Sequence, residues 1–313
     1  MISRRLVRIK AMQTYYAFLQ DDEEQNIDKV LEEMERNINK SYELFIHIHC
    51  LLIAIVDYAE EKIEIAKNKL IKTDKDVNPN TKFCNNRIIS AFMNDPTIKH
   101  AMSNSDMNWN ENPEFVRTLW MEINSSSYYK SFMNDPKDSF EQDFDIIKKI
   151  ISKNISDNPT LDEILEEKSI YWNDDLEFLC SNLMQNIKNY SKNISNYRLP
   201  KMFKAEQDRN FAFTLIKQAV LNKDIYDKKI LHCLQKWELE RIAFLDKVLI
   251  HLALTEIMKI PYIPVKVTIN EYLDIAKFYS TEKSSVFING IIDKIHIELK
   301  KSGELNKSGT GLL

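Results

Sequence analysis

The stretch that decides the fold is Glu240–Ile295, ERIAFLDKVLIHLALTEIMKIPYIPVKVTINEYLDIAKFYSTEKSSVFINGIIDKI. Its apolar residues recur at steps of three and four, which is the period of an α-helix, and Pro261 and Pro264 interrupt the pattern. The first helix, from about Trp237 to Leu252, is apolar on several sides, so we expect it to be central and mostly buried.

Two further helices follow the prolines. Thr268 and Glu271 have the spacing of a capping box, which predicts a helix start there. The last helix should follow Ser280 or Thr281 and bury one stripe of residues, namely Ile288, Ile291, Ile292, Ile295 and Leu299. The tail from Lys300 to Leu313 is rich in lysine, serine and glycine, so we expect it to be flexible.

Glycine is nearly absent from the body of the chain. Of the 4 glycines, Gly303, Gly309 and Gly311 lie near the C-terminus and only Gly290 lies elsewhere. Phosphate-binding loops, dinucleotide folds and most hairpins need glycine for positive φ or for close approach of the backbone. The sequence therefore predicts an all-α fold, disfavours an α/β nucleotide enzyme and indicates no cofactor.

The composition indicates a globular protein with no overall preference for an acidic partner. The 313 residues are 44% hydrophobic, and 43 basic against 47 acidic residues give a formal net charge of -4, so any nucleic-acid site must be local. The 4 cysteines are far apart in a chain of this size, which suits a reducing compartment. We expect a cytoplasmic protein, because no export signal or membrane-spanning run is evident.

The sequence pattern of the middle of the chain also predicts helices. Residues 27–72 contain neither proline nor glycine and carry apolar residues at helical spacing, so they predict a long helix with a hidden break or a projecting hairpin arm. From Pro79 to Pro200, prolines separate shorter amphipathic pieces. In the string FMNDP, which ends at Pro96 and again at Pro136, Asn and Asp before proline favour stopping a helix.

The N-terminus is basic. Arg4, Arg5, Arg8 and Lys10 precede the first acidic residue, and cations are mildly unfavourable in the first turns of a helix that begins near Ser3. Such a row fits an anionic partner, although a solvated basic end explains it equally well. The helical spacing of the arginines places them on a face that docks on the core.

Two residues of the last helix are candidates for ligand contact. Phe287 lies about 100° from the buried stripe, so its ring borders the core and can stack on a base, although packing at the core edge is the commoner role. Gly290 points nearly opposite the stripe and weakens the helix by about 1 kcal/mol relative to alanine. We expect something to approach closely there.

Metal ligands and catalytic groups are not indicated. His47, His49 and Cys50 form a cluster, but residues two and three apart on a helix do not converge on one ion, so we expect no metal. The other histidines have no paired nucleophile or base at local spacing, so we assign no catalytic residue.

The N-terminal stretch SRRLVRIKAMQTYYAF, Ser3–Phe18, and the C-terminal stretch quoted above resemble the two ends of the NusB family. The resemblance implies that residues 1–20 and 206–300 form a NusB-like helical domain. Residues 21–205 are then a helical insertion of unknown role, as in the enlarged NusB proteins of the Bacteroidetes type. Residues 301–313 are left as a flexible tail.

The resemblance also implies a function. It indicates a non-enzymatic transcription antitermination factor that binds boxA RNA together with NusE, the ribosomal protein S10, within the RNA polymerase antitermination complex and supports transcription of ribosomal RNA operons. Self-association into a homodimer stays open. A helical protein-interaction scaffold without RNA binding is the alternative, and an RNA methyltransferase module is disfavoured by the missing glycine-rich loop.

Matched position by position, the resemblance names site residues. RNA contacts fall on Arg4, Arg5, Arg8, Gln13, Ser284, Phe287 and Asn289, and partner contacts fall on Tyr16 and Asp246. The sequence departs from the family at Lys283, where many relatives have an acid, and at Leu6, where some have arginine. The expected mechanism needs the arginines of the first helix and the ring of Phe287 to converge on one single strand.

Overall fold

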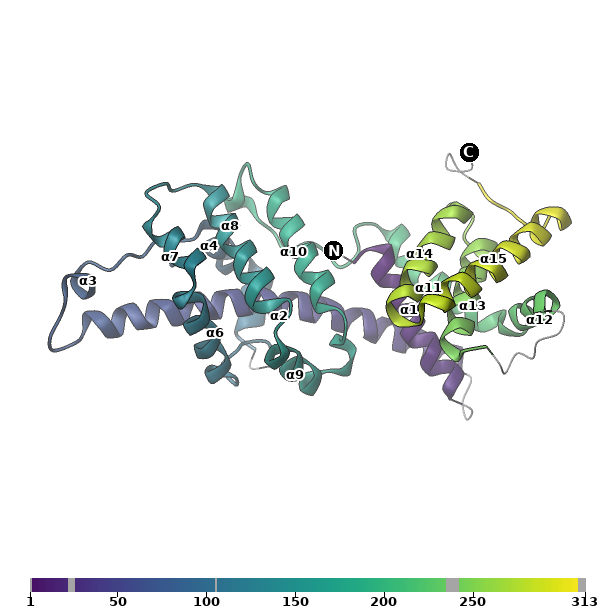
Figure 1. Ribbon diagram of the computed structural model, residues 1–313, viewed down its shortest axis with the longest axis horizontal. Helices are drawn as coiled ribbons and strands as arrows, with labels where there is room; N and C mark the ends of the chain where they lie inside the picture. The colour runs from purple at the N-terminus through teal and green to yellow at the C-terminus, as the bar shows by residue number, and fades with distance from the viewer. Residues whose placement is uncertain (1, 22–25, 105, 235–241, 309–313) are drawn as a thin grey trace. The chain divides into compact units, whose positions relative to one another are not determined.

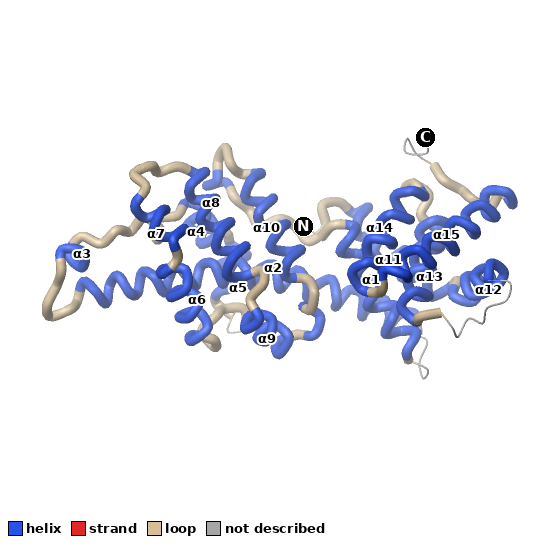
Figure 2. The backbone as a smooth tube through the Cα atoms, viewed as in Figure 1, coloured by secondary structure: helices blue, strands red, loops and turns tan. Residues whose placement is uncertain are grey.

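The computed structural model describes residues 2–21, 26–104, 106–234 and 242–308, and these are helical with no strand among them (Figure 2). The predicted all-α fold is therefore confirmed. The chain divides into two compact units. The middle unit comprises residues 39–201, and the terminal unit comprises residues 2–38 and 202–313. The sequence suggested a division at residues 20 and 206, whereas the compact units divide at residues 38 and 201.

The helices of the terminal unit are α1 (Arg4–Gln20), the first turns of α2 (Ile27–Lys67), α11 (Glu206–Leu221), α12 (Lys223–Leu234), α13 (Phe244–Lys259), α14 (Val265–Tyr279) and α15 (Glu282–Ser302). The middle unit holds the rest of α2, α3 (Asp74–Val77), α4 (Arg87–Asn94), α5 (Pro96–Met102), α6 (Pro113–Ser125), α7 (Ser127–Asn134), α8 (Phe140–Ile150), α9 (Pro159–Lys168) and α10 (Leu176–Asn189). A π-helical turn at Ile151–Ile155 and 3-10 turns at Ile170–Trp172 and Ile194–Asn196 complete it.

Helix α13 is the centre of the terminal unit (Figure 1). It packs against α1, α11, α12, α14 and α15. Its residues from Val248 to Ile257 are all buried. The expectation of a central, buried helix is thus met by the described part of this segment; Trp237, where we expected the helix to begin, lies outside the described residues.

The start of α14 differs from the expected capping box. The helix begins at Val265 after Pro264, so Thr268 already lies inside it. The hydroxyl of Thr268 donates to Oε1 of Glu256 at 2.8 Å, and Glu271 pairs with arginines of α1 instead of capping. Pro264 is the N-cap residue, and its carbonyl accepts the first hydrogen bonds of the helix while no side chain caps it.

Helix α15 follows its sequence pattern. Thr281 caps it by accepting a hydrogen bond from the backbone N–H of Ser284. The five residues of the predicted stripe are at most 5% exposed. Gly303, with φ 73°, ends the helix in the left-handed conformation that glycine adopts without strain.

The described part of the tail is more ordered than we expected. Nζ of Lys307 donates to the carbonyl oxygens of Glu256 and Ile260 at 3.0 and 2.8 Å, at the C-terminal end of α13. The N–H of Ser308 donates to the carbonyl of Pro261. Burial lowers the pKa of Lys307 to about 8. Cations are favoured at a helix C-terminus, which explains why the tail folds back there.

In the middle unit, α2 forms the long helix that the sequence predicted, without a break, and its far end with α3 makes the projecting arm (Figure 1). The FMNDP turn also behaves as expected. Asp95 ends α4 and its side chain caps α5 at the N–H groups of Thr97 and Ile98.

The apolar character of α2 corrects one expectation. By length and composition this helix has a window that could cross a membrane, whereas we expected no such run from the sequence. That window is 72% buried within the structure, as in the core helix of a soluble protein. All 4 cysteines are free thiols.

Candidate nucleic-acid interface

The first helix begins where its cations are. The side chain of Ser3 accepts a hydrogen bond from the N–H of Leu6, and no acidic residue lies in the first turn of α1. Leu6, Val7 and Ala11 are at most 1% exposed, because they pack on the core. This packing fixes the direction in which each arginine leaves the helix.

Arg8 lies inside the protein. Its side chain is 3% exposed, and its Nε and one Nη donate to the two oxygens of Glu256 at 2.8 and 2.7 Å. A second Nη lies 3.4 Å from Glu271. Burial opposes the charge, but the hydrogen bonds and charge of Glu256 outweigh it and raise the pKa of Arg8. The guanidinium is thus occupied by carboxylates and shielded from solvent, and the phosphate contact expected at Arg8 stays a prediction.

Arg4 and Arg5 are the cations that face solvent. Arg5 is 45% exposed and pairs with Glu271 and Asp274 of α14 at 2.9 Å each. Arg4 is 37% exposed and pairs with Asp208 at 3.1 Å. Exposed pairs of this kind contribute little stability, so a phosphate can replace the carboxylates at low cost.

Sequence reasoning missed two aromatic rings that lie within cation–π distance of Arg4. Its guanidinium carbon lies 5.4 Å from the ring centre of Tyr262 and 5.7 Å from that of Phe211. Tyr262 belongs to the PYIP segment, which we interpreted only as a helix break. A tyrosine flanked by prolines is the signal that could have revealed this contact.

Gln13 lies further along α1 and contacts α2. Its side-chain oxygen accepts a hydrogen bond from Asn37 of α2 at 3.3 Å, and the residue is half-buried. It therefore links α1 to the first turns of α2 and keeps only part of its surface for a ligand.

On α15, Phe287 is half-buried, which matches its expected place at the edge of the core. Its ring lines a cavity of about 280 Å³ whose other lining residues are Cys233, Leu234, Val286, Gly290, Ile291 and Lys294. A Cβ added to Gly290 would meet nothing within 4 Å. Among the described residues, therefore, no atom outside the helix backbone and the chain neighbours of Gly290 would touch a side chain at this position.

Ser284 and Asn289 differ in what they can offer. Ser284 is 6% exposed, and its hydroxyl bonds with those of Ser280 and Thr281 at 2.9 Å. Its side chain thus holds the start of α15, and the RNA contact expected there stays a prediction. Asn289 is half-exposed and donates to Asp293 at 3.2 Å, so its carbonyl oxygen stays accessible.

The two candidates for partner contact, Asp246 and Tyr16, differ in their exposure. Asp246 is 4% exposed and accepts a hydrogen bond from Ser280 at 2.9 Å, so its side chain ties α13 to the end of α14 and does not face a partner. Tyr16 is 39% exposed, and its ring packs edge-on against Phe244 at 4.8 Å. Tyr16 thus offers an aromatic surface.

Two of the contacts that position these residues lie at different places on α13. Arg8 contacts α13 at Glu256, whereas Ser280, at the end of α14 and next to the start of α15, contacts it at Asp246. Ten residues separate these positions, which is about 15 Å along a helix.

Behind this surface lies a buried polar network. Nε2 of His251 lies 3.0 Å from Asp227, which also pairs with Lys247, and Nδ1 lies 2.9 Å from the hydroxyl of Tyr15. Burial lowers the pKa of His251, although Asp227 acts in the opposite direction. The network joins α1, α12 and α13. Its members His251 and Tyr15 are fully buried, whereas Asp227 is 28% exposed.

The histidines of the middle unit are also core residues. Nδ1 of His47 donates to the carbonyl of Met107 at 2.8 Å, and its ring stacks on Trp109 at 4.3 Å. His49 bonds with Phe45 and Tyr197. In the part of the chain that the structure describes, no group of three or more His, Cys, Asp or Glu residues is arranged to hold a metal ion.

Comparison with known proteins bears on the same helices. The sequence profile of the NusB family matches residues 175–296, which run from the end of the middle unit through most of α15. The chain carries a NusB family domain in its C-terminal region. The match starts 31 residues (206 − 175) before the boundary at 206 that the resemblance suggested, so the matched stretch includes α10 of the middle unit.

Curated relatives agree with this domain. The chain is 43% identical over 105 residues to "Transcription antitermination protein NusB" of Chloroherpeton thalassium, covering 34% of this chain and 50% of that protein. It is 40% identical over 105 residues to the protein of that name from Salinibacter ruber, covering 34% and 66%, and 44% identical over 87 residues to that of Thermodesulfovibrio yellowstonii, covering 28% and 58%. The similarity thus spans half to two thirds of these relatives. No solved structure matches the chain.

Proposed function

We propose that this protein is a transcription antitermination factor that binds boxA-type RNA together with NusE, the ribosomal protein S10, and supports transcription of ribosomal RNA operons. It acts in the cytoplasm by binding and not as an enzyme. The observation that carries the proposal is the NusB family match, because it covers the helices that hold the counterions of Arg5 and the ring of Phe287.

The RNA would be held mainly through its backbone. Arg4 and Arg5 are the exposed cations of α1, and each is held in place by a single carboxylate or a pair of them. Phosphates would exchange with these carboxylates, which keeps the guanidinium groups positioned. Arg8 would act only as a positioning residue, because its ion pair with Glu256 fixes α1 on α13.

The base contacts would lie on α15. The half-buried ring of Phe287 offers a face on which an unpaired base can stack, and Lys294 lines the same cavity. The carbonyl oxygen of Asn289 is an acceptor on the same helix. The contacts that fix α1 and the start of α15 lie at different places along α13, so one RNA strand of several nucleotides would connect the arginines with these groups.

The protein partner would cover the other side of α1. Tyr16 and Phe244 form an exposed aromatic pair, and tyrosine is enriched at protein interfaces. A basic ribosomal protein bound there would add cations to a chain whose net charge is -4.

The test is RNA binding by the full chain, measured with a labelled boxA oligonucleotide in the presence of NusE at several salt concentrations. Replacing Arg4 and Arg5 by alanine should weaken binding and flatten the salt slope by about 0.7 for each phosphate that is no longer neutralised. Lys300→Ala with Lys301→Ala is the matched control, because it removes two exposed cations from the far end of α15. Equally weakened binding in both variants would refute the assignment.

The alternative is a helical protein-interaction scaffold without RNA binding. It is favoured by the middle unit, which contains a groove lined with aromatic and charged side chains. The scaffold would be favoured if the full chain with NusE failed to protect boxA RNA from nuclease under conditions in which a shorter NusB protein protects it.

A further inference from the structure

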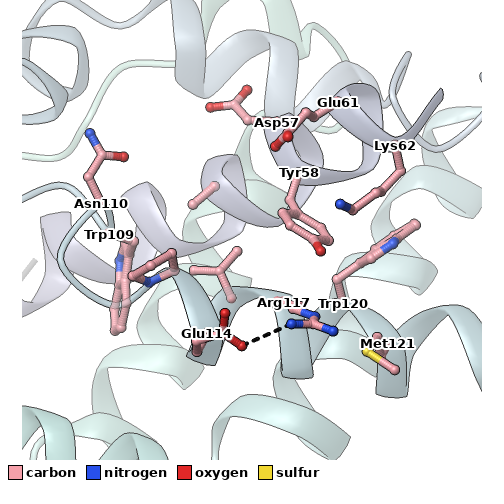
Figure 3. Close-up of a pocket in the computed structure, with 13 residues that line it drawn as sticks. Asp57, Tyr58, Glu61, Lys62, Trp109, Asn110, Glu114, Arg117, Trp120 and Met121 are labelled. Carbon is pink, nitrogen blue, oxygen red and sulfur yellow. Dashed lines mark hydrogen bonds and ion pairs between the residues drawn. The ribbon is translucent and has the colours of Figure 1, made fainter. Parts of the chain in front are cut away.

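The middle unit carries a groove between α2 and α6 that the proposed function does not use (Figure 3). Its volume is about 810 Å³. Helix α2 contributes Asp57, Tyr58, Glu61 and Lys62, and α6 with the segment before it contributes Trp109, Glu114, Arg117, Trp120 and Met121. A space of this size takes several side chains of a bound polymer, or a small molecule.

The aromatic walls of this groove are held in place. Trp109 is 4% exposed, and its Nε1 donates to the carbonyl of His47 at 3.2 Å. Trp120 stacks on Phe83 at 5.6 Å and meets Tyr129 edge-on at 5.4 Å. The wall is therefore preorganised, and a ligand would not have to order it.

A cation already lies on one of the aromatic faces. Nζ of Lys62 is 4.5 Å from the ring centre of Tyr58, within the range of a cation–π interaction. In Figure 3 Lys62 points toward the space between Tyr58 and Trp120. Lys62 thus makes with Tyr58 the same cation–π contact that an arginine or lysine of a partner would make.

The charges around the groove do not balance. Glu114 is paired with Arg117 at 3.2 Å (Figure 3), and Lys62 lies on Tyr58. Asp57 and Glu61, one turn apart on α2, have no ion pair in the described part of the chain. Partial burial raises the pKa of Asp57, and the nearby charge of Glu60 adds to this effect. Like charges four residues apart destabilise a helix, so an external cation would relieve them.

An apolar side chain also lines the groove, because Met121 is 58% exposed at its edge. Ile65, one turn beyond Glu61 on α2 and outside the lining, is 50% exposed. Large exposed apolar side chains next to a preformed groove are typical of a protein-binding surface.

We propose that this groove binds a basic peptide segment of a partner protein, whose arginine or lysine enters between Tyr58 and Trp120 and meets Asp57 and Glu61. Apolar residues of the segment flanking that cation pack on Met121 and Ile65. Arginine fits better than lysine, because its planar group stacks on aromatic rings and pairs with carboxylates. Nucleic acid is disfavoured, because the unpaired carboxylates would repel its phosphates.

The experiment uses the full chain and a fluorescein-labelled peptide of alternating arginine and leucine, about ten residues long, with binding followed by anisotropy. The peptide in which glutamate replaces arginine, and a single-stranded RNA of similar length, are the comparison probes. The parent protein should bind the basic peptide, with affinity that falls as salt is raised.

Three variants make the test specific. Asp57→Asn with Glu61→Gln should weaken binding about five- to tenfold, since both carboxylates that attract the peptide cation are neutralised. Lys62→Gln should strengthen binding of the basic peptide, because it frees the face of Tyr58 and removes a like charge. Glu64→Gln is the matched control: it lies on the next turn of α2, pairs with Lys67 outside the groove, and should leave the affinity unchanged.

The proposal is overturned by any of the following results: the basic peptide does not bind, the D57N/E61Q and E64Q variants show equally reduced affinity, or K62Q weakens binding. The last result, together with tighter binding of the RNA than of the peptide, would identify the groove as a nucleic-acid site instead. Because RNA binding by the terminal unit involves none of these residues, either proposal can fail without the other.

Discussion

Arg8 and Glu256 form a two-pronged ion pair, at 2.8 and 2.7 Å, in which the arginine is 3% exposed and the glutamate is fully buried. Thr268 donates to the same carboxylate at 2.8 Å and Tyr272 at 3.4 Å. Three helices, α1, α13 and α14, therefore meet at one buried charge. A side chain that resembles the RNA-binding set of a family is here part of the core.

Replacing Arg8 by methionine should lower the free energy of unfolding by about 3–5 kcal/mol, because Glu256 is left as a buried charge without its partner. Urea unfolding followed by circular dichroism measures this decrease. Arg8→Met combined with Glu256→Gln should recover much of it, since the glutamine still accepts from Thr268 and carries no charge. Arg5→Ala serves as a control and should cost less than about 1 kcal/mol, as its pairs are exposed.

The contrary outcome is informative. An Arg8→Met variant with the stability of the parent protein but reduced RNA affinity would show that the ion pair opens and that Arg8 reaches the RNA, as the sequence alone suggested.

Gly290→Ala should separate stability from binding. Alanine stabilises an exposed helix position by up to about 1 kcal/mol, and the added Cβ meets nothing within 4 Å. The melting temperature should therefore rise. If RNA passes over Gly290 beside Phe287, its affinity should fall, whereas Ile297→Ala, on the same exposed face two turns away, should leave it unchanged. RNA affinity equal to that of the parent protein would show that no ligand approaches this glycine.

Acid should destabilise the protein through its buried histidines. Burial lowers the pKa of His47 and of His49 to about 4 each, and lowers that of His251 as well. Below the unfolded value of about 6.5 the unfolded chain binds protons that the folded chain does not, so stability is present above that pH and is lost as the pH falls toward 4. The expected slope is about 1.4 kcal/mol per pH unit for each such histidine.

Urea unfolding at a series of pH values between 7 and 4 measures this slope. His49→Gln should reduce the slope by about 1.4 kcal/mol per pH unit, the contribution of one proton. The side chain of His232 is 77% exposed, so His232→Gln should keep the slope of the parent protein. A flat stability profile over this range would contradict the prediction.

The tail should protect the end of α13. Lys307 bonds to the carbonyl oxygens of Glu256 and Ile260, so Lys307→Met should destabilise the last turn of this helix by about 1 kcal/mol. Hydrogen exchange of the amides near Ile260 should become faster, and Lys301→Met, an exposed lysine nearby in sequence, provides the comparison. Exchange rates equal in the two variants would mean that the tail does not hold this end.

Much of the fold followed from the sequence, because helical periodicity in α13 and α15 is strong and almost no glycine or proline competes with it. The stripe from Ile288 to Leu299 was correctly predicted, and the helix follows Thr281, one of the two residues that the sequence offered as its start. The start of α14 was wrongly predicted. Thr268 and Glu271 have capping-box spacing, but their side chains bond with Glu256 of α13 and Arg8 of α1.

The candidate site was less accessible to prediction. Spacing alone cannot tell which of Arg4, Arg5 and Arg8 faces solvent, since the partner of Arg8 lies 248 residues away along the chain. Ser284 and Asp246 are similar cases. The hydroxyl of Ser284 bonds with those of Ser280 and Thr281, and the carboxylate of Asp246 accepts a hydrogen bond from Ser280. Phe287, whose position relative to its own helix stripe was known, was placed correctly at the core edge.

One helix belongs to two hydrophobic cores. Helix α2 places Met34 and Ile38 in the terminal unit and Leu44 and Phe45 in the middle unit, and all four side chains are at most 1% exposed. A deletion that trims the protein to the size of a short relative cannot simply cut at loops. It must end α2 in mid-helix, leaving carbonyl oxygens without donors, so the junction has to be redesigned with a new helix terminator such as glycine.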